Sequence, residues 1–315
     1  MSEPNDGGTT AVAKEEEIAA DWADLTRECL LNVLSRLSVE DRWRGAMLVC
    51  KSWLAASTDS SLHTAFDLDA RFDSGPDFPR WWSPEFERRI DSMLRSAITW
   101  SDGTLVVIRT RHCSDRSINF AAERCPKLEI LSVQSSPNVT DASMARIASN
   151  CSQLRELDLS YCHEISHEAL ALVGRNCPNL TTLKRNFYNY LDSSQHQRSV
   201  PNEYLMACPL EADSEAAAIG KFMPGLKHLE LRFLRLTGKG IASICEGCSN
   251  LEFLDLSGCA NVSGRDIANS TLRLKNLKQV KKPNFYIPRS LFAHTERYGH
   301  WNLYDERFQT DVFRI

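Results

Sequence analysis

The 315-residue sequence lacks any uninterrupted apolar run of about 18–20 residues, the length needed to cross a bilayer. Its first residues, MSEPNDGGTTAVAKEEE, also lack the basic and then apolar order of a secretory signal. An excess of one charge is missing too, because 37 basic and 41 acidic side chains leave a net charge of −4. Such a balance offers no electrostatic footprint for nucleic acid. We therefore expect no membrane partner, no nucleic-acid partner, and a location in the nucleus or the cytoplasm.

Cysteine, by contrast, is plentiful, with 11 residues. In a reducing compartment these are more often buried thiols or metal ligands than disulfides, and their spacing decides between the two. Hydrophobic residues make up 43% of the chain, which is enough to build a core. Because the chain is longer than a usual domain of ~100–200 residues, we expect two units or an elongated repeat array.

The cysteines mark an internal repeat. Cys125, Cys151 and Cys177 open the segments CPKLEILSV, CSQLRELDL and CPNLTTLKR at a spacing of about 26 residues. The segments MPGLKHLEL, CSNLEFLDL and LKNLKQV continue the same pattern. Each unit contains L-x-x-L-x-L, which predicts a strand, followed by a helical pattern. A strand and a helix in every such period predict leucine-rich repeats that stack into a curved α/β solenoid.

Two further cysteines refine this interpretation. Cys162 and Cys259, in LDLSYCHEIS and LDLSGCANVS, stand at the corner where other leucine-rich repeats carry asparagine. These lines resemble the cysteine-containing repeats of many F-box proteins. The segment 103–125 adds a shorter first repeat, so we expect about seven repeats over residues 101–281. A single Cys245-x-x-Cys248 pair does not make a zinc site, and Cys113 beside His112 does not make a hydrolase.

The third repeat is interrupted near residues 185–212. The text KRNFYNYLDSSQHQRSVPNEYLMACPLEAD adds about 20 residues, and long loops in compact arrays are usually functional or disordered. Both readings stay open here. The insertion carries the aromatic residues Phe187, Tyr188, Tyr190 and Tyr204.

The N-terminal part has a different character. Residues 1–20 are polar and aperiodic and predict a disordered tail. A predicted helix follows, with Thr26 as its cap and an apolar face made by Leu30, Val33, Leu34 and Leu37. A second apolar run, from Met47 to Trp53, predicts another helix. So small a unit has more apolar surface than it can bury internally, so we expect it to bind a partner.

Residues 21–67 resemble the F-box. Leu25 opens the motif, LLNVLSRL supplies its first helix, VEDRWRGAMLVCKSW carries the V-C-K-x-W signature, and SSLHTAFDL closes it. Thr26 stands where the family usually has proline, and His63 where tryptophan is commoner. Both departures lower the expected affinity for an adaptor. From residue 21 to residue 315 the chain resembles plant F-box proteins with leucine-rich repeats.

The resemblance implies a substrate-recognition subunit of an SCF-type cullin-RING ubiquitin ligase. Such a subunit is not an enzyme, needs no cofactor, and contacts cullin and RING subunits through a Skp-type adaptor. The expected adaptor-binding residues are Leu25, Thr26, Leu30, Val33, Leu34 and Leu37. Among these we expect Leu25 and Leu34 to face the partner, whereas Leu30, like Val49 and Trp53, favours the module's own core. The alternative is an interaction scaffold whose F-box acts outside ubiquitin transfer.

The protein target, whose identity the sequence does not indicate, should meet the concave strand surface, where side chains alternate with the buried leucines. The expected target-binding residues are Glu156, Asp158, Lys184, His228, Arg232, Phe253 and Asp255. Phe253 and Arg232 lead, because aromatic and arginine side chains are favoured at binding hot spots. For Asp158 and Asp255 the alternative is a merely solvated strand face.

Two segments are expected to close the solenoid. Residues 68–100 form a connector whose helix, with the face Phe86, Ile90, Met93 and Leu94, should cap the first repeat. Residues 282–315 are rich in aromatic side chains and should cap the last repeat, because a terminal repeat exposes its leucines. A second target-binding element is the alternative for this tail.

Overall fold

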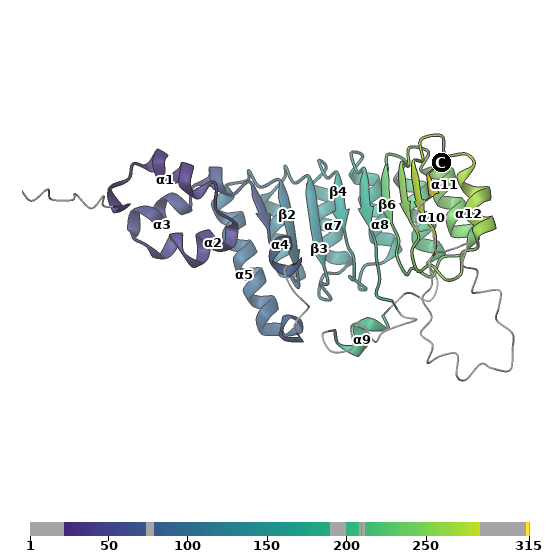
Figure 1. Cartoon of the computed structure of the whole chain (residues 1–315), viewed down its shortest axis with the longest axis horizontal. Coiled ribbons are helices and arrows are strands. Elements are labelled where there is room, and N and C mark those ends of the chain that lie inside the picture. Colours follow the sequence, from purple (N-terminus) through teal and green to yellow (C-terminus); the bar gives the residue numbers. More distant parts are fainter. Residues whose placement is uncertain are drawn as a thin grey trace, which may run out of the picture.

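The computed structural model describes residues 22–73, 79–189, 200–207, 209, 212–283 and 313–314. The expected disordered tail of residues 1–20, Tyr190, and most of the expected C-terminal cap lie outside these ranges. The unit that resembles an F-box, hereafter called the F-box, comes first and comprises η1 (Trp22–Asp24), α1 (Arg27–Leu34), α2 (Val39–Arg44), η2 (Ala46–Leu48), α3 (Lys51–Ser57) and η3 (Ser60–Leu62). It lies at one end of an elongated molecule (Figure 1).

The connector follows as β1 (Ala65–Asp67), α4 (Asp69–Asp73), η4 (Pro79–Trp82) and α5 (Pro84–Ser101). Strands then alternate with helices. The strands are β2 (Val107–Arg111), β3 (Ile130–Gln134), β4 (Glu156–Asp158), β5 (Thr182–Lys184), β6 (His228–Glu230), β7 (Phe253–Asp255) and β8 (Gln279–Lys281). The helices are α6 (Asp115–Arg124), α7 (Asp141–Asn150), α8 (His167–Asn176), α9 (Asn202–Leu205), α10 (Asp213–Phe222), α11 (Gly238–Gly247) and α12 (Gly264–Thr271).

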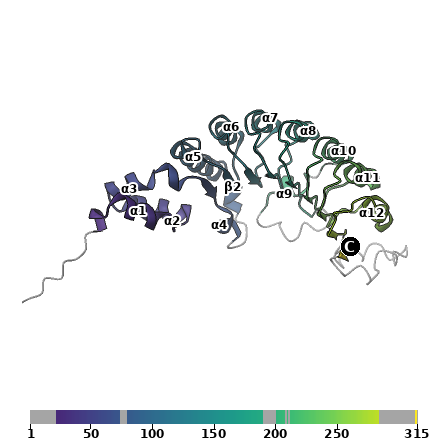
Figure 2. The ribbon, with the colours of Figure 1, turned by 90° about the horizontal axis from the view of Figure 1, so that it is seen from above.

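The strands form one sheet in chain order, parallel from β1 to β8, and β9 (Phe313–Arg314) joins β8 antiparallel. Helices line the outer side of an arc and strands line its inner side (Figure 2). This arrangement confirms the predicted α/β array with an N-terminal helical unit. The two predicted F-box helices differ in detail: α1 ends at Leu34, before Leu37, and an extended Cys50 separates η2 from α3.

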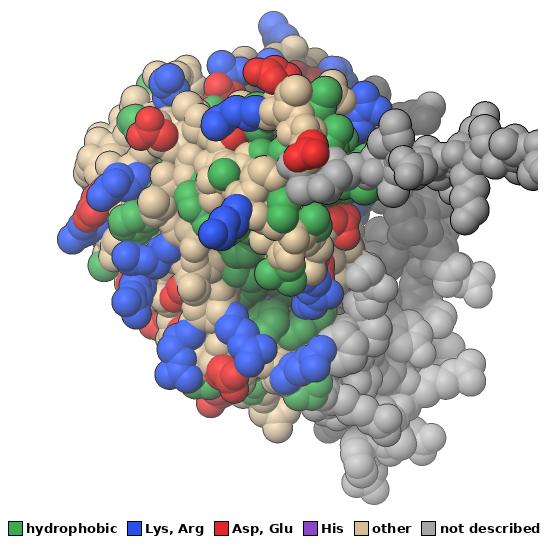
Figure 3. Space-filling model, turned by 90° about the vertical axis from the view of Figure 1, so that its left-hand side faces the viewer, with side chains coloured by type: hydrophobic (Ala, Val, Ile, Leu, Met, Phe, Trp, Pro, Cys, Tyr) green, Lys and Arg blue, Asp and Glu red, His purple; other side chains and the backbone are tan. Residues whose placement is uncertain are grey.

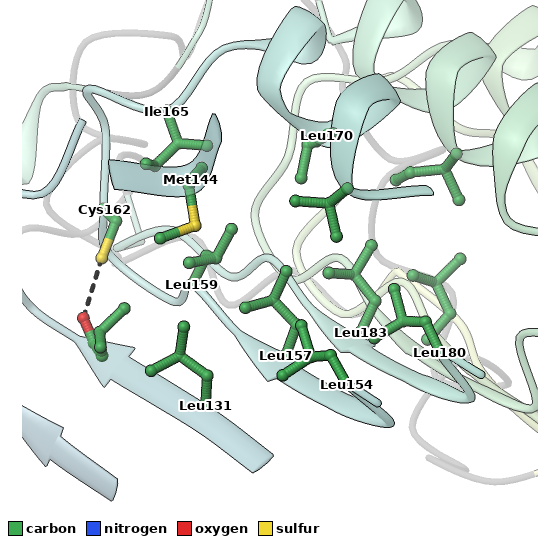
Figure 4. Packing of buried hydrophobic residues seen from close by; sticks show 14 of the residues in the cluster. Leu131, Met144, Leu154, Leu157, Leu159, Cys162, Ile165, Leu170, Leu180 and Leu183 are labelled. Atoms are coloured by element: carbon green, nitrogen blue, oxygen red, sulfur yellow. Dashed lines mark hydrogen bonds between the residues drawn. The ribbon is translucent and has the colours of Figure 1, made fainter. Parts of the chain in front are cut away.

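Leucines hold the array together. Leu131, Leu157 and Leu183 lie opposite one another in register on successive strands and are fully buried. Further leucines and Met144 fill the space between sheet and helices (Figure 4). Burying one such side chain stabilises the fold by about 1.5–3 kcal/mol. No strand–helix unit can bury its leucines alone, so each depends on its neighbours.

Two buried cysteines provide hydrogen-bond donors for backbone carbonyl oxygens of the preceding repeat. The Cys162 thiol lies 3.0 Å from the carbonyl oxygen of Val133, and the Cys259 thiol lies 2.9 Å from that of Leu231 (Figure 4 shows the first of these contacts). Burial raises the pKa of Cys162 to about 12, so this thiol stays protonated and can donate. Every described cysteine is free of disulfides.

A ladder of carboxylates links the helices at their N-termini. Asp115 accepts hydrogen bonds from the Thr140 backbone N–H at 2.8 Å and from its hydroxyl at 2.6 Å. Thr140 in turn caps α7, so α6 positions the start of α7. The same contact joins Asp141 to Ser166, Asp213 to Thr237 and, from the connector, Asp91 to Ser114.

The Asp91 contact shows that α5 takes the place of a repeat helix, and it ties the connector firmly to the first repeat. Aromatic contacts extend this junction to the F-box. The Trp100 ring of α5 meets Trp43 edge-on at 5.4 Å and His63 at 5.2 Å. The F-box and the solenoid are thus joined by packed side chains rather than by a bare linker.

The backbone turns out of the sheet at a recurring corner. His112, Ser135, Tyr161 and Phe233 each follow a strand and have positive φ values between 50° and 65°. This left-handed conformation is uncommon for bulky side chains. Here it places three rings, those of His112, Tyr161 and Phe233, at the edge of the solenoid formed by the carboxyl ends of the strands.

The carboxylate ladder gives a first prediction. Replacing Asp115 with alanine should lower the free energy of unfolding by about 1–3 kcal/mol, because the part-buried Thr140 N–H and hydroxyl lose their acceptor. Urea denaturation followed by circular dichroism measures the change. Glu123→Ala is the matched control on the same helix, since its pair with Arg146 is exposed and should matter by less than about 0.5 kcal/mol. Equal effects of the two variants would contradict the ladder's role.

Candidate interaction surfaces

The F-box carries most of the exposed apolar surface. Seven large hydrophobic side chains are exposed in the described part of the chain, and five of them belong to the F-box: Trp22, Val33, Leu48, Val49 and Leu54. Leu48 is 77% exposed and Val49 is 56% exposed. Figure 3 looks onto the F-box end of the molecule and shows hydrophobic side chains gathered there, with lysine and arginine side chains around them. Such a cluster is typical of a protein interface.

The F-box's own core uses other positions. Leu30, Leu34, Ala46, Ala56 and Leu62 are buried together, with Leu25, Leu37 and Trp53 half-buried against them. The prediction that Leu30 and Trp53 favour the core is therefore consistent with the structure. The prediction that Leu34 faces the partner is wrong, because its side chain is fully buried between α1 and α3.

The expected adaptor residues thus separate into two groups. Val33 and Thr26 are exposed, and the Thr26 hydroxyl accepts a hydrogen bond from the Cys29 N–H at 3.4 Å, which confirms the predicted cap. Leu25 and Leu37 reach the surface only in part, whereas Leu30 and Leu34 do not reach it.

Sequence reasoning missed Trp22, Leu48 and Leu54 and placed Val49 in the core. The structure corrects Val49, because the chain runs through η2 and then an extended residue instead of one continuous helix, which turns Leu48 and Val49 outward. A signal was present: no single helix face can bury four consecutive apolar residues such as Met47 to Cys50.

His63 also has a different role from the one its position suggested. It is buried, with Nε2 at 2.8 Å from the Ser57 carbonyl oxygen and its ring against Trp100. Burial lowers the pKa of His63 and favours the neutral ring. His63 therefore belongs to the packed junction with α5 and not to the exposed surface of the F-box.

The inner face of the sheet brings charged residues into one row. The aligned positions are Asp67, Arg109, Ser132, Asp158, Lys184, Glu230, Asp255 and Lys281. Lys184 lies 4.0 Å from Glu156 and 3.9 Å from Asp158. Arg232 lies 3.2 Å from Glu230 and 2.8 Å from Asp255. The expected target-binding residues are thus close together, and their charges largely neutralise one another.

Two of these residues are buried beneath the others. Asp158 is 3% exposed and Asp255 is fully buried, which excludes a solvated strand face for both. Each carboxylate accepts a hydrogen bond from the backbone N–H two residues later, at 3.0 Å. Burial raises the pKa of Asp158. Both aspartates support the strand ends and orient the cations above them, so neither can meet a target directly.

The accessible part of the charged face centres on β6 and β7. The His228 and Phe253 rings stack at 4.3 Å with an interplanar angle of 8°, and the Lys281 ammonium lies 5.4 Å from the Phe253 ring centre. Burial alone would raise the pKa of Glu230, but its hydrogen bond with His228 and its ion pair with Arg232 lower it to about 2. These residues form a half-exposed aromatic and cationic platform over an ionised carboxylate.

The described part of the insertion packs back onto the solenoid. Phe187 and Tyr188 are buried, and the Tyr188 ring stacks on Tyr161 at 4.2 Å. Tyr204, in α9, stacks on Trp82 of the connector at 4.8 Å and on His163 at 4.8 Å. Phe187, Tyr188 and Tyr204 therefore hold the described part of the insertion against the solenoid.

Sequence reasoning missed Arg185. It occupies the third leucine position of the interrupted repeat and is fully buried. Its guanidinium contacts both carboxylate oxygens of Glu215 at 3.1 Å and donates to the carbonyl oxygens of Cys162 and, at 2.7 Å, Ile165. Glu215 belongs to α10, the helix that follows the insertion. Arg185 thus fixes the point where the chain re-enters the solenoid.

The buried ion pair predicts strong coupling. Arg185→Leu should lower the free energy of unfolding by about 3–5 kcal/mol, because Glu215 would remain as a buried carboxylate without a partner. The double variant Arg185→Leu/Glu215→Leu should recover much of this loss. Denaturant unfolding of both variants is the measurement, and a double variant less stable than Arg185→Leu would contradict the pairing.

His112 predicts a pH dependence. Burial, and secondarily the nearby Arg111 charge, lowers the pKa of His112 to about 3, and its Nδ1 has no hydrogen-bond partner among the described residues. In the unfolded chain His112 takes up a proton at about pH 6.5, whereas in the folded chain it does so only at about pH 3. The free energy of unfolding therefore keeps its full value above about pH 6.5 and decreases as the pH falls toward about 3. In His112→Phe this step should be missing from the pH profile of the unfolding free energy. A profile identical to that of the unchanged protein would refute the assignment.

No helix in the described ranges has the length and apolarity to cross a membrane, and the His, Cys, Asp and Glu side chains described there form no cluster of three suited to a metal.

Comparisons with known proteins agree with the two-part architecture. Residues 22–64 match the F-box domain. The chain is 56% identical over 301 residues to F-box protein SKIP1 of Arabidopsis thaliana, covering 95% of this chain and 100% of that protein. It is 55% identical over 282 residues to putative F-box/LRR-repeat protein 19 of the same plant, covering 90% of this chain and 94% of the relative.

A more distant relative, putative F-box/LRR-repeat protein 23 of Arabidopsis thaliana, is 32% identical over 243 residues, which cover 77% of this chain and 49% of that protein. A chain in the crystal structure of the Rad7 and Elc1 complex in yeast aligns over 73% of this chain and 70% of its own length, at 14% identity and a TM-score of 0.29. Near-complete coverage at more than half identity settles the relationship: the chain belongs to the plant F-box/LRR-repeat family.

Proposed function

We propose that this protein is the substrate-recognition subunit of an SCF-type cullin-RING ubiquitin ligase. The observation that carries the proposal is the exposed apolar cluster of the F-box, defined by Trp22, Val33, Leu48, Val49 and Leu54. A Skp-type adaptor would cover this cluster and connect the chain to cullin and RING subunits. Burying it would remove most of the exposed large apolar side chains of the described chain from water.

The protein contributes proximity rather than catalysis. A target held on the solenoid meets the ubiquitin-conjugating enzyme at high effective concentration, provided that the distance between adaptor and target is fixed. The Asp91–Ser114 contact and the packing of Trp100 on Trp43 and His63 favour such a fixed distance.

For target binding we propose the platform of His228, Arg232, Phe253 and Lys281, with Glu156 and Lys184 at its border. These side chains are partly exposed, carry both charges and include an aromatic ring. Asp158 and Asp255 support the platform from below. A protein surface with paired charges around an apolar side chain would match it.

Two finer assignments belong to the same proposal. The thiol contacts of Cys162 and Cys259 favour repeats of the cysteine-containing type, and the strands β2 to β8 favour about seven of them. A nucleus or cytoplasm location fits the free thiols of the described cysteines.

The alternative is an interaction scaffold whose F-box binds an adaptor outside ubiquitin transfer. The two functions differ in a reconstitution with purified adaptor, cullin and RING subunits. A ligase subunit co-elutes with the whole assembly on size-exclusion chromatography, whereas a scaffold of this kind elutes with the adaptor alone.

The adaptor surface can be tested with one matched pair of variants. Leu48→Asp should abolish co-purification with a Skp-type adaptor, because it places a charge without a partner in the apolar interface. Leu272→Asp is the control, since Leu272 is 82% exposed but lies in the solenoid at the far end of the described chain. Circular dichroism should show that both variants remain folded.

Retained adaptor binding by Leu48→Asp, or equal loss in Leu272→Asp, would contradict the proposed surface. Leu34→Asp is not a test of the interface, since burying its charge should unfold the F-box itself.

A further inference from the structure

A groove on the outer side of the arc, next to the F-box, is separate from both proposed protein interfaces. Helix α5 and the first turn of α6 line it, and it encloses about 450 Å³. The lining residues are Arg88, Asp91, Ser92, Arg95, Ser96, Thr99, Trp100 and Arg116. Helices α5 and α6 lie side by side on this outer side in Figure 2. The groove therefore faces away from the charged inner surface of the sheet.

Three arginines line this groove, and none of them forms an ion pair with a described carboxylate there. Arg88, Arg95 and Arg116 form no ion pair with any described residue, although Arg95 also lies over the Phe120 ring at 4.4 Å. Arg89, the next residue on α5, shows the contrast, since it pairs with Glu85 at 2.5 Å. Unlike Arg89, the three arginines of the groove therefore keep their guanidinium groups free of any described carboxylate within ion-pair distance.

The carboxylate that lines the groove, that of Asp91, already accepts hydrogen bonds from α6 and its cap. Asp91 is 6% exposed and accepts hydrogen bonds from the Ser114 N–H at 3.0 Å, the Ser114 hydroxyl at 2.5 Å and the Ser117 hydroxyl at 2.6 Å. These contacts hold α6 against α5. Its negative charge is therefore turned toward the N-terminus of α6 and offers no direct partner to the arginines.

The arrangement is unfavourable for the empty groove. Arg116 lies in the first turn of α6, where the positive end of the helix dipole disfavours a cation. Arg88 and Arg95 add like charges along the same groove. A bound anion would relieve this repulsion, and guanidinium groups bind phosphate oxygens in a bidentate manner.

The spacing indicates more than one anionic group. Arg88 and Arg95 are two helical turns apart, which corresponds to about 10 Å along α5. Ser92, Ser96 and Thr99 place hydroxyl groups along the same stretch. We infer that this groove binds a small soluble molecule that bears two or more phosphate groups.

The position of the groove suggests what such a ligand would do. Trp100 lines the groove and also packs on Trp43 and His63 of the F-box. A ligand that bridges α5 and α6 would stiffen the junction on which the distance between F-box and solenoid depends. The junction should consequently resist unfolding better when the ligand is bound.

The test uses the full chain and inorganic tripolyphosphate as the probe. Isothermal titration at constant ionic strength should detect saturable binding at least tenfold tighter than that of orthophosphate or sulfate, together with a rise in the melting temperature. Arg95→Gln/Arg116→Gln should weaken tripolyphosphate binding at least tenfold. Arg89→Gln is the control and should leave it unchanged, because Arg89 does not line the groove.

The free double variant should be as stable as the unchanged protein or more stable, because the substitutions remove like-charge repulsion. Circular dichroism therefore separates loss of binding from loss of folding. Equal binding of tripolyphosphate and sulfate, or an equal effect of Arg89→Gln, would overturn the inference. Tighter binding of a doubly phosphorylated peptide than of tripolyphosphate would overturn the small-molecule assignment and identify a protein ligand.

Discussion

The packing of leucines between successive strands is the constraint on which the rest of the structure depends. Leu131, Leu157 and Leu183 are locked in register, so neighbouring repeats approach as closely as strands can, about 4.8 Å. Helices need about 8–10 Å between their axes. The mismatch bends the array, with strands inside and helices outside (Figure 2). The curvature, and therefore the inner surface available to a target, follows from the leucine core.

The same stacking explains why the polar groups occur in ladders. Each repeat leaves backbone carbonyls at one corner and a helix start at another, and a neighbour one repeat away satisfies both. Cys162 and Cys259 contact the carbonyls, and Asp115 and Asp141 hold the caps of the following helices. Where the insertion interrupts the array, Arg185 replaces a leucine and reconnects the two parts through Glu215. A buried charge is tolerated there because every donor of its guanidinium has an acceptor within reach.

The interaction surfaces depend on what this packing leaves uncovered. In the F-box, Leu30 and Leu34 are buried in the small internal core, whereas Leu48 and Val49 are exposed. On the sheet, Asp158 and Asp255 are buried, and their carboxylates pair with the more exposed Lys184 and Arg232. Both surfaces therefore consist of side chains that the core does not bury. Sequence periodicity predicts mainly the buried positions, so the composition of these surfaces is hard to infer from it.

The sequence by itself determined the repeat period, the leucine positions, the strand register and the cap at Thr26, because these follow from local periodicity and from spacing along the chain. Only the tertiary structure decided that Leu34 lies in the core and Val49 on the surface. It also decided that Asp158 supports the target-binding face from below instead of contacting a target, and that Arg185 is buried. Those outcomes depend on which element lies opposite each side chain. Arg185 meets a glutamate 30 residues away, across the insertion, and no local pattern encodes that contact.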